Sequence, residues 1–277
     1  MEYISAKQAA RNWNISQRRV LALCADGRIE NLVRIGNMWL IPCNTEKPVD
    51  GRSLRYDKVQ IKSFKPFVKW AGGKGQLLSD IRRIYPEGLG KTITKYAEPF
   101  VGGGAVLFDI LSNYHLDEVY ISDCNVELMN TYSMIRNNVD ELVDLLSAMQ
   151  AEYHMLDTVA QKDYFYAKRN RFNMIKSIVG GAQGIEGAAL FIFLNRTCFN
   201  GLYRVNSKGQ FNVPIGSYKR PLICDNETLL NVSHALQNVT IVCGDYKESA
   251  SFIDAKTFVY FDPPYRPLNS TSGFTSY

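Results

Sequence analysis

One short segment of the sequence has residue types suited to chemistry on an amino group. Asp262-Pro263-Pro264-Tyr265 follows an apolar run at residues 257–261, so we expect it where a strand passes into a loop. There the Asp carboxylate can accept one hydrogen of an exocyclic amino group. A carbonyl held rigid by the prolines can accept the other hydrogen, and the Tyr ring can stack on a base. The segment therefore predicts a site for alkylation of a base nitrogen; a strand end stiffened by prolines is the alternative.

A glycine-rich segment predicts a cofactor pocket. Pro99-Phe100-Val101-Gly102-Gly103-Gly104 follows a predicted strand at 92–95 and precedes a predicted helix at 105–111. Glycines let the backbone approach a ligand at the carboxyl end of a strand, although the full dinucleotide fingerprint is not present. A second predicted strand, 118–121, ends at Ser122-Asp123, about 20 residues beyond the glycines, where an acidic side chain can accept both hydroxyls of a ribose.

The segment Lys69-Trp70-Ala71-Gly72-Gly73-Lys74 is similar in glycine and lysine content to a phosphate-binding loop, but it lacks two residues that such a loop needs. Val68 stands where the first glycine is needed, and Gly75 stands where Ser or Thr would hold magnesium, so nucleoside triphosphate binding is a poor fit. Trp70 instead offers a face for an aromatic ring or a sulfonium cation, and Lys74 can pair with a carboxylate. Together with the ribose acceptor, this pattern predicts S-adenosylmethionine as the cofactor.

Composition narrows the class of protein. The chain has 277 residues, 46% of them hydrophobic, and a formal net charge of +5, so nucleic-acid binding must be argued from where the charge lies. The six cysteines form no Cys-x-x-Cys pair and the three histidines are far apart, so we expect reduced thiols and no metal site. We find no leader segment and no apolar run of about 18 residues, and therefore expect a cytoplasmic protein with no membrane partner.

Residues 1–43 are predicted to form a small domain. Ser5 and Ser16 are placed to cap two helices, and two apolar runs flank the turn Gly36-Asn37 as in a hairpin. This order is that of a winged helix-turn-helix, and it resembles the small domains of the MerR and excisionase type.

The basic start of the second helix favours DNA as the ligand of this domain. Arg18 and Arg19 lie there and are the predicted contacts. The alternative is a small capping subdomain without a DNA role. Residues 44–63 change to prolines, glycine and alternating charges, as expected for an exposed linker.

Residues 64–277 resemble the DNA adenine-N6 methyltransferases of the Dam type, the D12 class. Four pieces carry the resemblance in the order of that family: Lys69-Trp70-Ala71-Gly72-Gly73-Lys74, Glu98-Pro99-Phe100-Val101-Gly102-Gly103-Gly104, Phe211-Asn212-Val213-Pro214-Ile215-Gly216 and Asp262-Pro263-Pro264-Tyr265. The resemblance implies an α/β fold with a doubly wound, Rossmann-like sheet. It also implies that methyl is transferred from S-adenosylmethionine to N6 of a flipped adenine in duplex DNA, by direct displacement.

The resemblance also assigns roles to residues. Asp262, Pro263, Pro264 and Tyr265 would form the catalytic motif, with Asp262 and Tyr265 holding the target adenine. Asp245 and Tyr246, after a predicted strand at 239–243, match the contact to the adenine of the cofactor. The implied cofactor-binding residues are Trp70, Lys74, Glu98, Phe100, Gly102, Gly104, Asp123, Asp245, Tyr246 and Asp262.

The stretch from Arg196 to Arg220 contains no acidic residue and predicts a hairpin that faces DNA, with Ser207-Lys208-Gly209 near its tip. Cations for phosphates alternate there with aromatic rings for stacking. It resembles the target-recognition hairpin of the same family, whose common target is GATC, although Tyr203 and Val205 stand among the expected base readers and could alter them. A hairpin that only packs on a helix is the alternative.

By this resemblance, Phe199 and Asn200 would enter the duplex where the adenine leaves, and Leu202 and Arg204 would read bases in the major groove. The implied DNA contacts of this domain are Lys69, Phe199, Asn200, Leu202, Arg204 and Lys208.

The methyltransferase domain is predicted at 64–277, with the recognition insertion at about 135–222. Twelve residues follow Tyr265, whereas the sheet of this family continues through three more strands. We therefore expect a truncated chain whose C-terminal strands are missing and whose fourth strand forms an apolar edge.

Two functions follow from these patterns. One is a DNA adenine methyltransferase with an added N-terminal DNA-binding module, and the other is a non-catalytic DNA-binding or regulatory protein that retains a methyltransferase remnant. Methylation of cytosine N4 or of RNA is disfavoured, because Asp precedes the Pro-Pro-Tyr and the basic hairpin matches the DNA family. We expect a monomer that binds double-stranded DNA, and the sequence leaves open a cognate restriction endonuclease as a partner.

Overall fold

The protein, seen in a computed structural model, divides into two compact units at residues 1–60 and 61–277. The structure describes residues 3–13, 15–25, 29, 32–36, 38–45, 47, 64–178 and 183–264. Asn37 of the predicted hairpin turn, most of the predicted linker, and the segment from Tyr265 onward lie outside the described residues. The predicted C-terminal truncation therefore stays a prediction.

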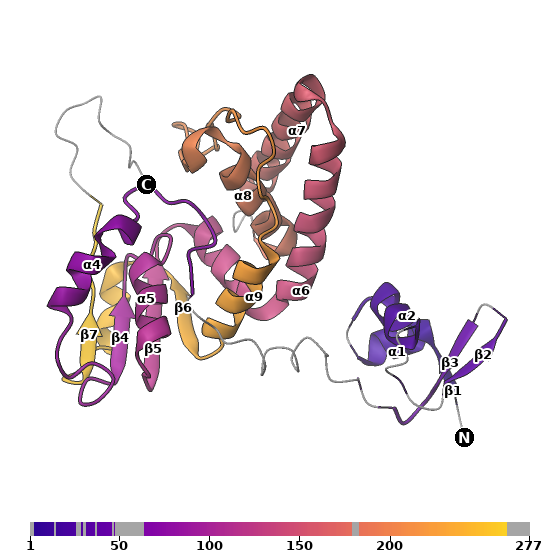
Figure 1. The fold of residues 1–277 in the computed structure, drawn as a ribbon, viewed down its shortest axis with the longest axis horizontal. Coiled ribbons are helices and arrows are strands. Elements are labelled where there is room, and N and C mark those ends of the chain that lie inside the picture. Colours follow the sequence, from indigo (N-terminus) through magenta and orange to yellow (C-terminus); the bar gives the residue numbers. More distant parts are fainter. Residues whose placement is uncertain are drawn as a thin grey trace. The chain divides into compact units, whose positions relative to one another are not determined.

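Among its described residues, the first unit contains two short helices and a three-stranded antiparallel sheet (Figure 1). Its elements are β1 (Tyr3–Ser5), α1 (Ala6–Asn12), α2 (Gln17–Ala25), β2 (Val33–Ile35) and β3 (Met38–Pro42). Ser5 caps α1 in a capping box with Gln8, and the Ser16 hydroxyl accepts the Arg19 N–H at 3.2 Å. The predicted helices and hairpin strands are thus confirmed as elements. β1, which pairs with β3, was not predicted.

The second unit is built on a parallel sheet. Its strands are β4 (Lys95–Glu98), β5 (Glu118–Asp123), β6 (Val239–Cys243) and β7 (Thr257–Val259), in the order β6-β5-β4-β7. The predicted position of the first strand, 92–95, is wrong by three residues. Thr92 and Ile93 belong instead to a turn in which both N–H groups donate to the Gly88 carbonyl at 2.9 Å.

The connections between these strands make the sheet doubly wound. From β4 the chain passes through α5 (Ala105–Asn113) to β5, and from β5 through α6 (Val126–Met155) and later helices to β6. It then returns through η4 (Tyr246–Ser251) to β7 on the other side of β4. The topological switch point therefore lies between β4 and β7, at the sheet edge where such folds bind nucleotides.

Side-chain contacts show that both faces of the sheet are covered. Phe108 of α5 and Tyr132 of α6 stack at 6.4 Å between ring centroids, so these helices share one face. Tyr120 of β5 points to the opposite face and packs against Phe252, which follows η4, at 5.3 Å. The α/β class with helices on a parallel sheet is confirmed.

A helical module is inserted between β5 and β6 (Figure 1). It contains the second part of α6, α7 (Thr158–Lys176), α8 (Gly184–Thr197), η3 (Phe199–Gly201) and a hairpin, and α9 (Asn226–Ala235) leads back to the sheet. α6 has a non-helical residue at Asn138 (φ −137°, ψ 34°). Leu128 and Tyr132 before this kink and Leu142 and Leu146 after it are fully buried, so α6 joins the sheet and the module into one core.

The remaining short helices, η1 (Lys74–Leu77), α4 (Leu78–Ile81) and η2 (Arg82–Ile84), precede β4. In the part of the chain that the structure describes, no helix has the length and apolar character needed to cross a membrane. Within the same residues, His, Cys, Asp and Glu side chains form no group of three or more that could hold a metal ion.

Candidate functional site

The predicted cofactor residues collect at the carboxyl edge of the parallel sheet. Glu98 ends β4, Asp123 ends β5, Asp245 and Tyr246 follow β6, and Asp262 follows β7. Carboxyl ends of neighbouring parallel strands meet at one edge, so the topology brings together residues that are up to 164 positions apart in the sequence.

Asp123 holds the glycine-rich loop in place. Its Oδ2 accepts the Gly102 N–H at 3.1 Å, and its Oδ1 accepts the Asn125 N–H at 2.9 Å. Burial raises the pKa of Asp123, and these two backbone donors oppose that rise. Each carboxylate oxygen has a further lone pair, so the side chain can bind the loop and a ligand hydroxyl at the same time.

Glu98 is a buried acid at the end of β4. It is 3% exposed, and its Oε2 accepts the Tyr96 hydroxyl proton at 2.7 Å. Burial raises the pKa of Glu98 to about 8, and the negative charge of Asp262 adds to the rise, whereas the Tyr96 hydrogen bond opposes it. A buried carboxyl with this pKa is protonated over much of the neutral pH range.

The Asp-Pro-Pro motif is anchored by a lysine. Lys74 Nζ forms an ion pair with Oδ2 of Asp262 and also donates a hydrogen bond to the Gly72 carbonyl at 2.8 Å. Both side chains of the pair are largely buried, with exposures of 12% for Lys74 and 22% for Asp262. Pro263 and Pro264 follow as exposed residues, and the predicted catalytic Tyr265 lies outside the described residues.

An exposed group of aromatic rings lies at the same edge. Phe100 and Tyr246 stack with centroids 5.5 Å apart, and Phe261 packs against both, at 6.2 Å and 6.4 Å. Tyr246 is 43% exposed and Phe261 is 50% exposed, so ring surface is available to a planar ligand. Phe261 was not predicted as a site residue, although its place directly before the motif could have indicated it.

Asp245 has a structural role in addition to its predicted one. Its carboxylate accepts the Lys247 N–H at 2.9 Å, and its own N–H donates to Glu248 at 3.1 Å, which forms a capping box at the start of η4. This cap fixes the position of Tyr246, the first residue of η4.

Trp70 is packed between the glycine loop and the hairpin that was predicted to recognise DNA. A Cβ placed on Gly102 would lie 2.7 Å from the indole ring, so only glycine allows this close approach. Trp70 also stacks on Tyr203, with centroids 5.8 Å apart and an interplanar angle of 23°. One face of the Trp70 ring, which was predicted to be available to a ligand, is therefore covered by Tyr203.

The predicted hairpin is present, and its tip lies at the predicted residues; that it faces DNA stays a prediction. Val205 pairs with Phe211, and the Asn206 N–H donates to the Gln210 carbonyl at 2.9 Å, which closes a turn over residues 207–209. Arg204 and Lys208 are exposed, and Arg204 Nε donates to Asn212 Oδ1 at 2.8 Å. Leu202, by contrast, is partly buried against the core.

The base of the hairpin has an unusual backbone. Asn200 and Gly201 both adopt positive φ, at 55° and 65°, in the short helix η3. This conformation leaves Phe199 50% exposed and Asn200 exposed. A Cβ on Gly201 would lie 2.6 Å from the Lys69 side chain, so the turn and Lys69 are tightly packed.

A buried amide clamps Lys69 to this turn. Asn195 Oδ1 accepts the Lys69 N–H at 2.9 Å, and Asn195 Nδ2 donates to the carbonyls of Lys69 and Gly201, both at 2.8 Å. The Lys69 ammonium lies over the Tyr218 ring, 4.7 Å from its centroid. Asn195 was missed at the sequence level, because nothing local distinguishes it from other residues of an apolar helix.

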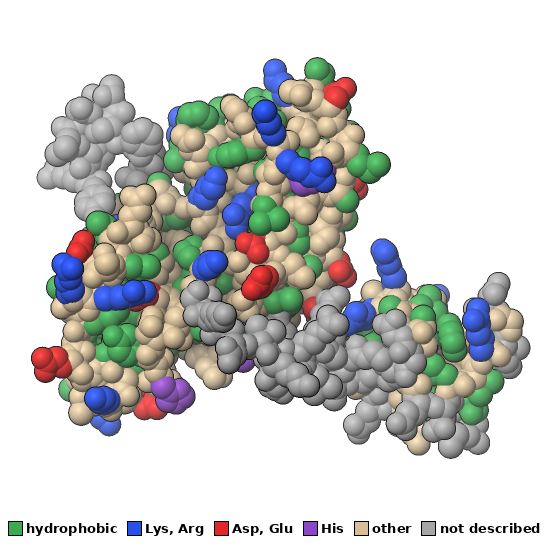
Figure 2. All heavy atoms as spheres, viewed as in Figure 1, with side chains coloured by type: hydrophobic (Ala, Val, Ile, Leu, Met, Phe, Trp, Pro, Cys, Tyr) green, Lys and Arg blue, Asp and Glu red, His purple; other side chains and the backbone are tan. Residues whose placement is uncertain are grey.

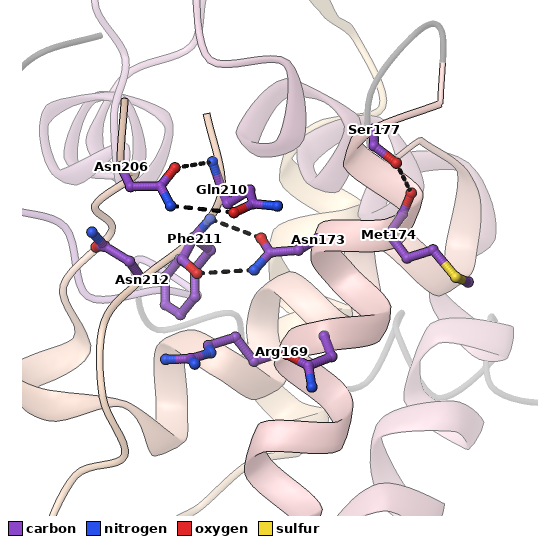
Figure 3. Close-up of a pocket in the computed structure, with 9 residues that line it drawn as sticks. Arg169, Asn173, Met174, Ser177, Asn206, Gln210, Phe211 and Asn212 are labelled. Atoms are coloured by element: carbon purple, nitrogen blue, oxygen red, sulfur yellow. Dashed lines mark hydrogen bonds between the residues drawn. The ribbon is translucent and has the colours of Figure 1, made fainter. Parts of the chain in front are cut away.

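A polar cavity of about 400 Å³ separates α7 from the hairpin (Figure 3). Asn173 of α7 bridges it with two hydrogen bonds to the backbone of Phe211, at 2.7 Å and 3.0 Å. The cavity is lined by residues of α7 and of the hairpin: Arg169, Asn170, Asn173, Met174, Ser177, Asn206, Gln210, Phe211 and Asn212. The cavity thus lies in the helical module, and its lining includes none of the residues at the sheet edge.

Basic side chains are spread over the visible face of the helical module, among hydrophobic ones (Figure 2).

In the N-terminal unit, Arg18 is exposed on the first turn of α2 and Arg19 beside it is half-buried.

Comparison with known proteins covers most of the chain. Residues 70–277 match the family model described as D12 class N6 adenine-specific DNA methyltransferase. The type II methyltransferase M.MjaIII of Methanocaldococcus jannaschii is 52% identical over 214 residues, which are 77% of this chain and 73% of that protein. The DNA adenine methylase of Haemophilus influenzae is 35% identical over 81% of this chain and 73% of its own length. That of Escherichia coli K12 is 36% identical over 78% of this chain and 70% of its own length.

Proposed function

The chain belongs to the D12 class of N6 adenine-specific DNA methyltransferases, and on this premise we propose that it methylates adenine within GATC sites, using S-adenosylmethionine bound at the carboxyl edge of its sheet. The GATC target rests on the resemblance of the hairpin to that of the Dam-type enzymes, and the observation that carries the donor and reaction site is the convergence of the strand ends. They place an acid of the Asp-Pro-Pro motif, a glycine loop and exposed aromatic rings at one edge.

The residues at this edge fit a nucleoside that carries an amino-acid tail. The exposed rings of Tyr246 and Phe261 offer stacking surface for an adenine, and Asp123 offers lone pairs to ribose hydroxyls. When bound, the cofactor would supply a methyl group activated by a sulfonium centre. Lys74 is positioned at this edge to meet a carboxylate, although it now pairs with Asp262.

Asp262 is the residue to which we assign the target amino group. Its carboxylate accepts a hydrogen of N6 and stabilises the positive charge that develops on this nitrogen as the methyl is transferred. The ion pair with Lys74 fixes the position of the carboxylate before the base arrives, so less reorganisation is needed. Pro263 limits the backbone motion of the carbonyl that would accept the second hydrogen.

The hairpin is the element to which we assign sequence recognition. Replacing Arg204 with Ala should relax discrimination at one base pair by about 1–3 kcal/mol, because a bidentate contact to a base edge would be lost. Rates of methylation on duplexes with each single-base change of the target would measure this effect. Lys208→Ala, at the tip, is the matched control: its loss should weaken binding equally on all duplexes, as expected for a phosphate contact. A uniform loss for Arg204→Ala would contradict base reading.

The proposed target and donor can be tested together. Duplexes with GATC, and duplexes with each position of GATC changed, are incubated with S-adenosylmethionine labelled on the methyl group. We expect label in N6-methyladenine from the GATC duplex only. Equal label in all duplexes, or label at another recurring sequence, would contradict the GATC assignment, and no label in any DNA would contradict the donor.

We also propose that the N-terminal unit is a winged helix-turn-helix that binds DNA through α2. The exposed Arg18 at the start of this helix and the hairpin of β2 and β3 that follows the helix in the chain support the proposal. Replacing Arg18 and Arg19 with Ala should weaken duplex binding several-fold, while kcat at saturating DNA stays unchanged. The slope of the logarithm of the binding constant against the logarithm of salt concentration should fall by the amount expected for about two phosphate contacts. Titrations at several salt concentrations measure this. An unchanged salt dependence would favour a capping subdomain.

Two further assignments rest on the same premise. The relative from M. jannaschii is named a type II methyltransferase, which supports a cognate restriction endonuclease as the partner of this chain. We expect an endonuclease from the same cells that cuts the unmethylated target but not the methylated one. Equal cutting of both targets would exclude that endonuclease as the cognate partner.

The chain should act as a monomer, and a dimer mass in light scattering would contradict this.

A further inference from the structure

The side chain of Tyr203 links the recognition hairpin to the cofactor edge. Its neighbour Arg204 is exposed, whereas the Tyr203 ring turns inward and stacks on Trp70 at 5.8 Å. The same ring contacts Phe191 of α8 at 5.5 Å and Phe211 of the hairpin at 5.8 Å. Tyr203 therefore cannot read a base from this position, although it stands in the sequence between two predicted base readers.

The Tyr203 hydroxyl binds a buried ion pair. Lys176 Nζ donates to this hydroxyl at 2.9 Å, and the hydroxyl donates to Glu127 Oε2 at 3.0 Å. Lys176 and Glu127 also pair directly at 2.6 Å, and their side chains are only 14% and 9% exposed. Removing one partner of such a buried pair would leave an unpaired charge, so we expect the pair and the Tyr203 hydroxyl to hold one fixed geometry.

Both contacts of Tyr203 lead to the glycine loop. Trp70 packs on Gly102, as shown above. Glu127 lies in the first turn of α6, four residues after Asp123, whose carboxylate binds the Gly102 N–H. The hairpin is thus connected to the same loop by a stack of rings and by an ion pair at the start of α6.

We propose that Tyr203 is a positioning residue that couples target recognition to methyl-donor binding. The inference rests on the proposed function, because it assigns the donor to the carboxyl edge and the target to the hairpin. When DNA holds the hairpin with the Tyr203 ring on Trp70, the glycine loop is held in the geometry that binds the donor. By linkage, donor binding must strengthen target binding by the same factor.

The test measures this factor directly. The dissociation constant of S-adenosylhomocysteine, the demethylated product, is determined by calorimetry with and without a saturating GATC duplex. We expect the duplex to tighten binding by about fivefold or more in the wild-type chain. In Tyr203→Phe, which keeps the stack but removes the hydroxyl, this factor should fall by about threefold or more, while the constant without DNA changes by less than about twofold.

Two further variants separate coupling from simple damage to the fold. Tyr164→Phe is the matched control: its hydroxyl also binds a glutamate, Glu152, at 2.6 Å between α7 and α6, but on the exposed surface, so the factor should not change. Replacing Glu127 with Gln and Lys176 with Met together removes the pair without leaving one charge unpaired, and it should lower the factor as Tyr203→Phe does.

The outcomes distinguish the two proposals. If the wild-type chain binds neither S-adenosylhomocysteine nor the duplex, the proposed function fails and the coupling fails with it. If it binds both but independently, or if the coupling factor is the same in Tyr203→Phe and wild type, the coupling alone is overturned. A lower factor in Tyr203→Phe with an unchanged factor in Tyr164→Phe supports it.

Discussion

Replacing Asp262 with Asn is expected to lower the rate of methyl transfer by on the order of 10²–10³, because a preorganised negative charge at the reacting nitrogen is lost. DNA affinity should change by no more than a few-fold, since the hairpin and the basic surface are not altered. Single-turnover rates with saturating duplex, measured beside equilibrium titration of the same duplex, separate the two effects.

Asp254→Asn provides the matched control for this substitution. Asp254 lies near the opposite end of β7 and also pairs with a lysine, Lys95, at 3.1 Å. The same change there should leave the rate of transfer unaltered, because this pair is at the amino edge of the sheet. If Asp262→Asn retained the wild-type rate, the assignment of the target amino group to this carboxylate would be wrong.

Replacing Glu98 with Gln is expected to change how stability depends on pH. The pKa of Glu98 rises from 4.5 to about 8 in the folded protein because the side chain is buried. Between these values the folded state holds a proton that the unfolded state has released, so the wild-type chain loses stability as pH rises, by about 1.4 kcal/mol per pH unit, and the loss levels off above the folded pKa. Gln resembles the protonated acid and should not show this loss.

Urea unfolding of both chains from pH 5.5 to 9 measures the effect. The stability of Glu98→Gln relative to wild type should increase steadily up to about pH 8 and then stay constant. Glu186→Gln is a control of opposite sign. In the wild-type chain, the hydrogen bonds that Arg171 donates to Glu186 lower the pKa of this acid. The ionised Glu186 therefore stabilises the fold above its unfolded pKa, and Glu186→Gln should be less stable than the wild type at neutral pH. A pH-independent difference for Glu98→Gln would show that Glu98 is ionised in the folded protein.

The sheet could be predicted from the sequence where strands are apolar. β6 has its predicted bounds, and β5 was located within two residues, because each contains a run of at least three residues with apolar or β-branched side chains. β4 was misplaced because only two of its four residues are apolar, and it ends in Glu98. That residue is accommodated through burial beside Tyr96, an arrangement that the hydrophobic pattern does not reveal. β1 was not predicted because it is only three residues long and pairs with a distant strand: Ile4 of β1 lies opposite Ile41 of β3.

The candidate site was predictable to the extent that motifs follow strand ends. Once the strands are parallel and the crossover is doubly wound, Asp123, Tyr246 and Asp262 must meet at one edge. The contacts that connect this edge to the hairpin were not predictable. Tyr203 and Glu127 are 76 positions apart, and Asn195 and Lys69 are 126 apart, so no local pattern marks either pair.

The most direct test of the account is the crystal structure of this chain with S-adenosylhomocysteine and a GATC duplex. We predict the nucleoside at the carboxyl edge of the sheet, with its adenine against Tyr246 or Phe261 and its ribose at Asp123. The target adenine should be out of the duplex, with its amino group at Asp262. A nucleoside bound elsewhere, or a target adenine still paired in the duplex with Asp262 far from it, would contradict the account.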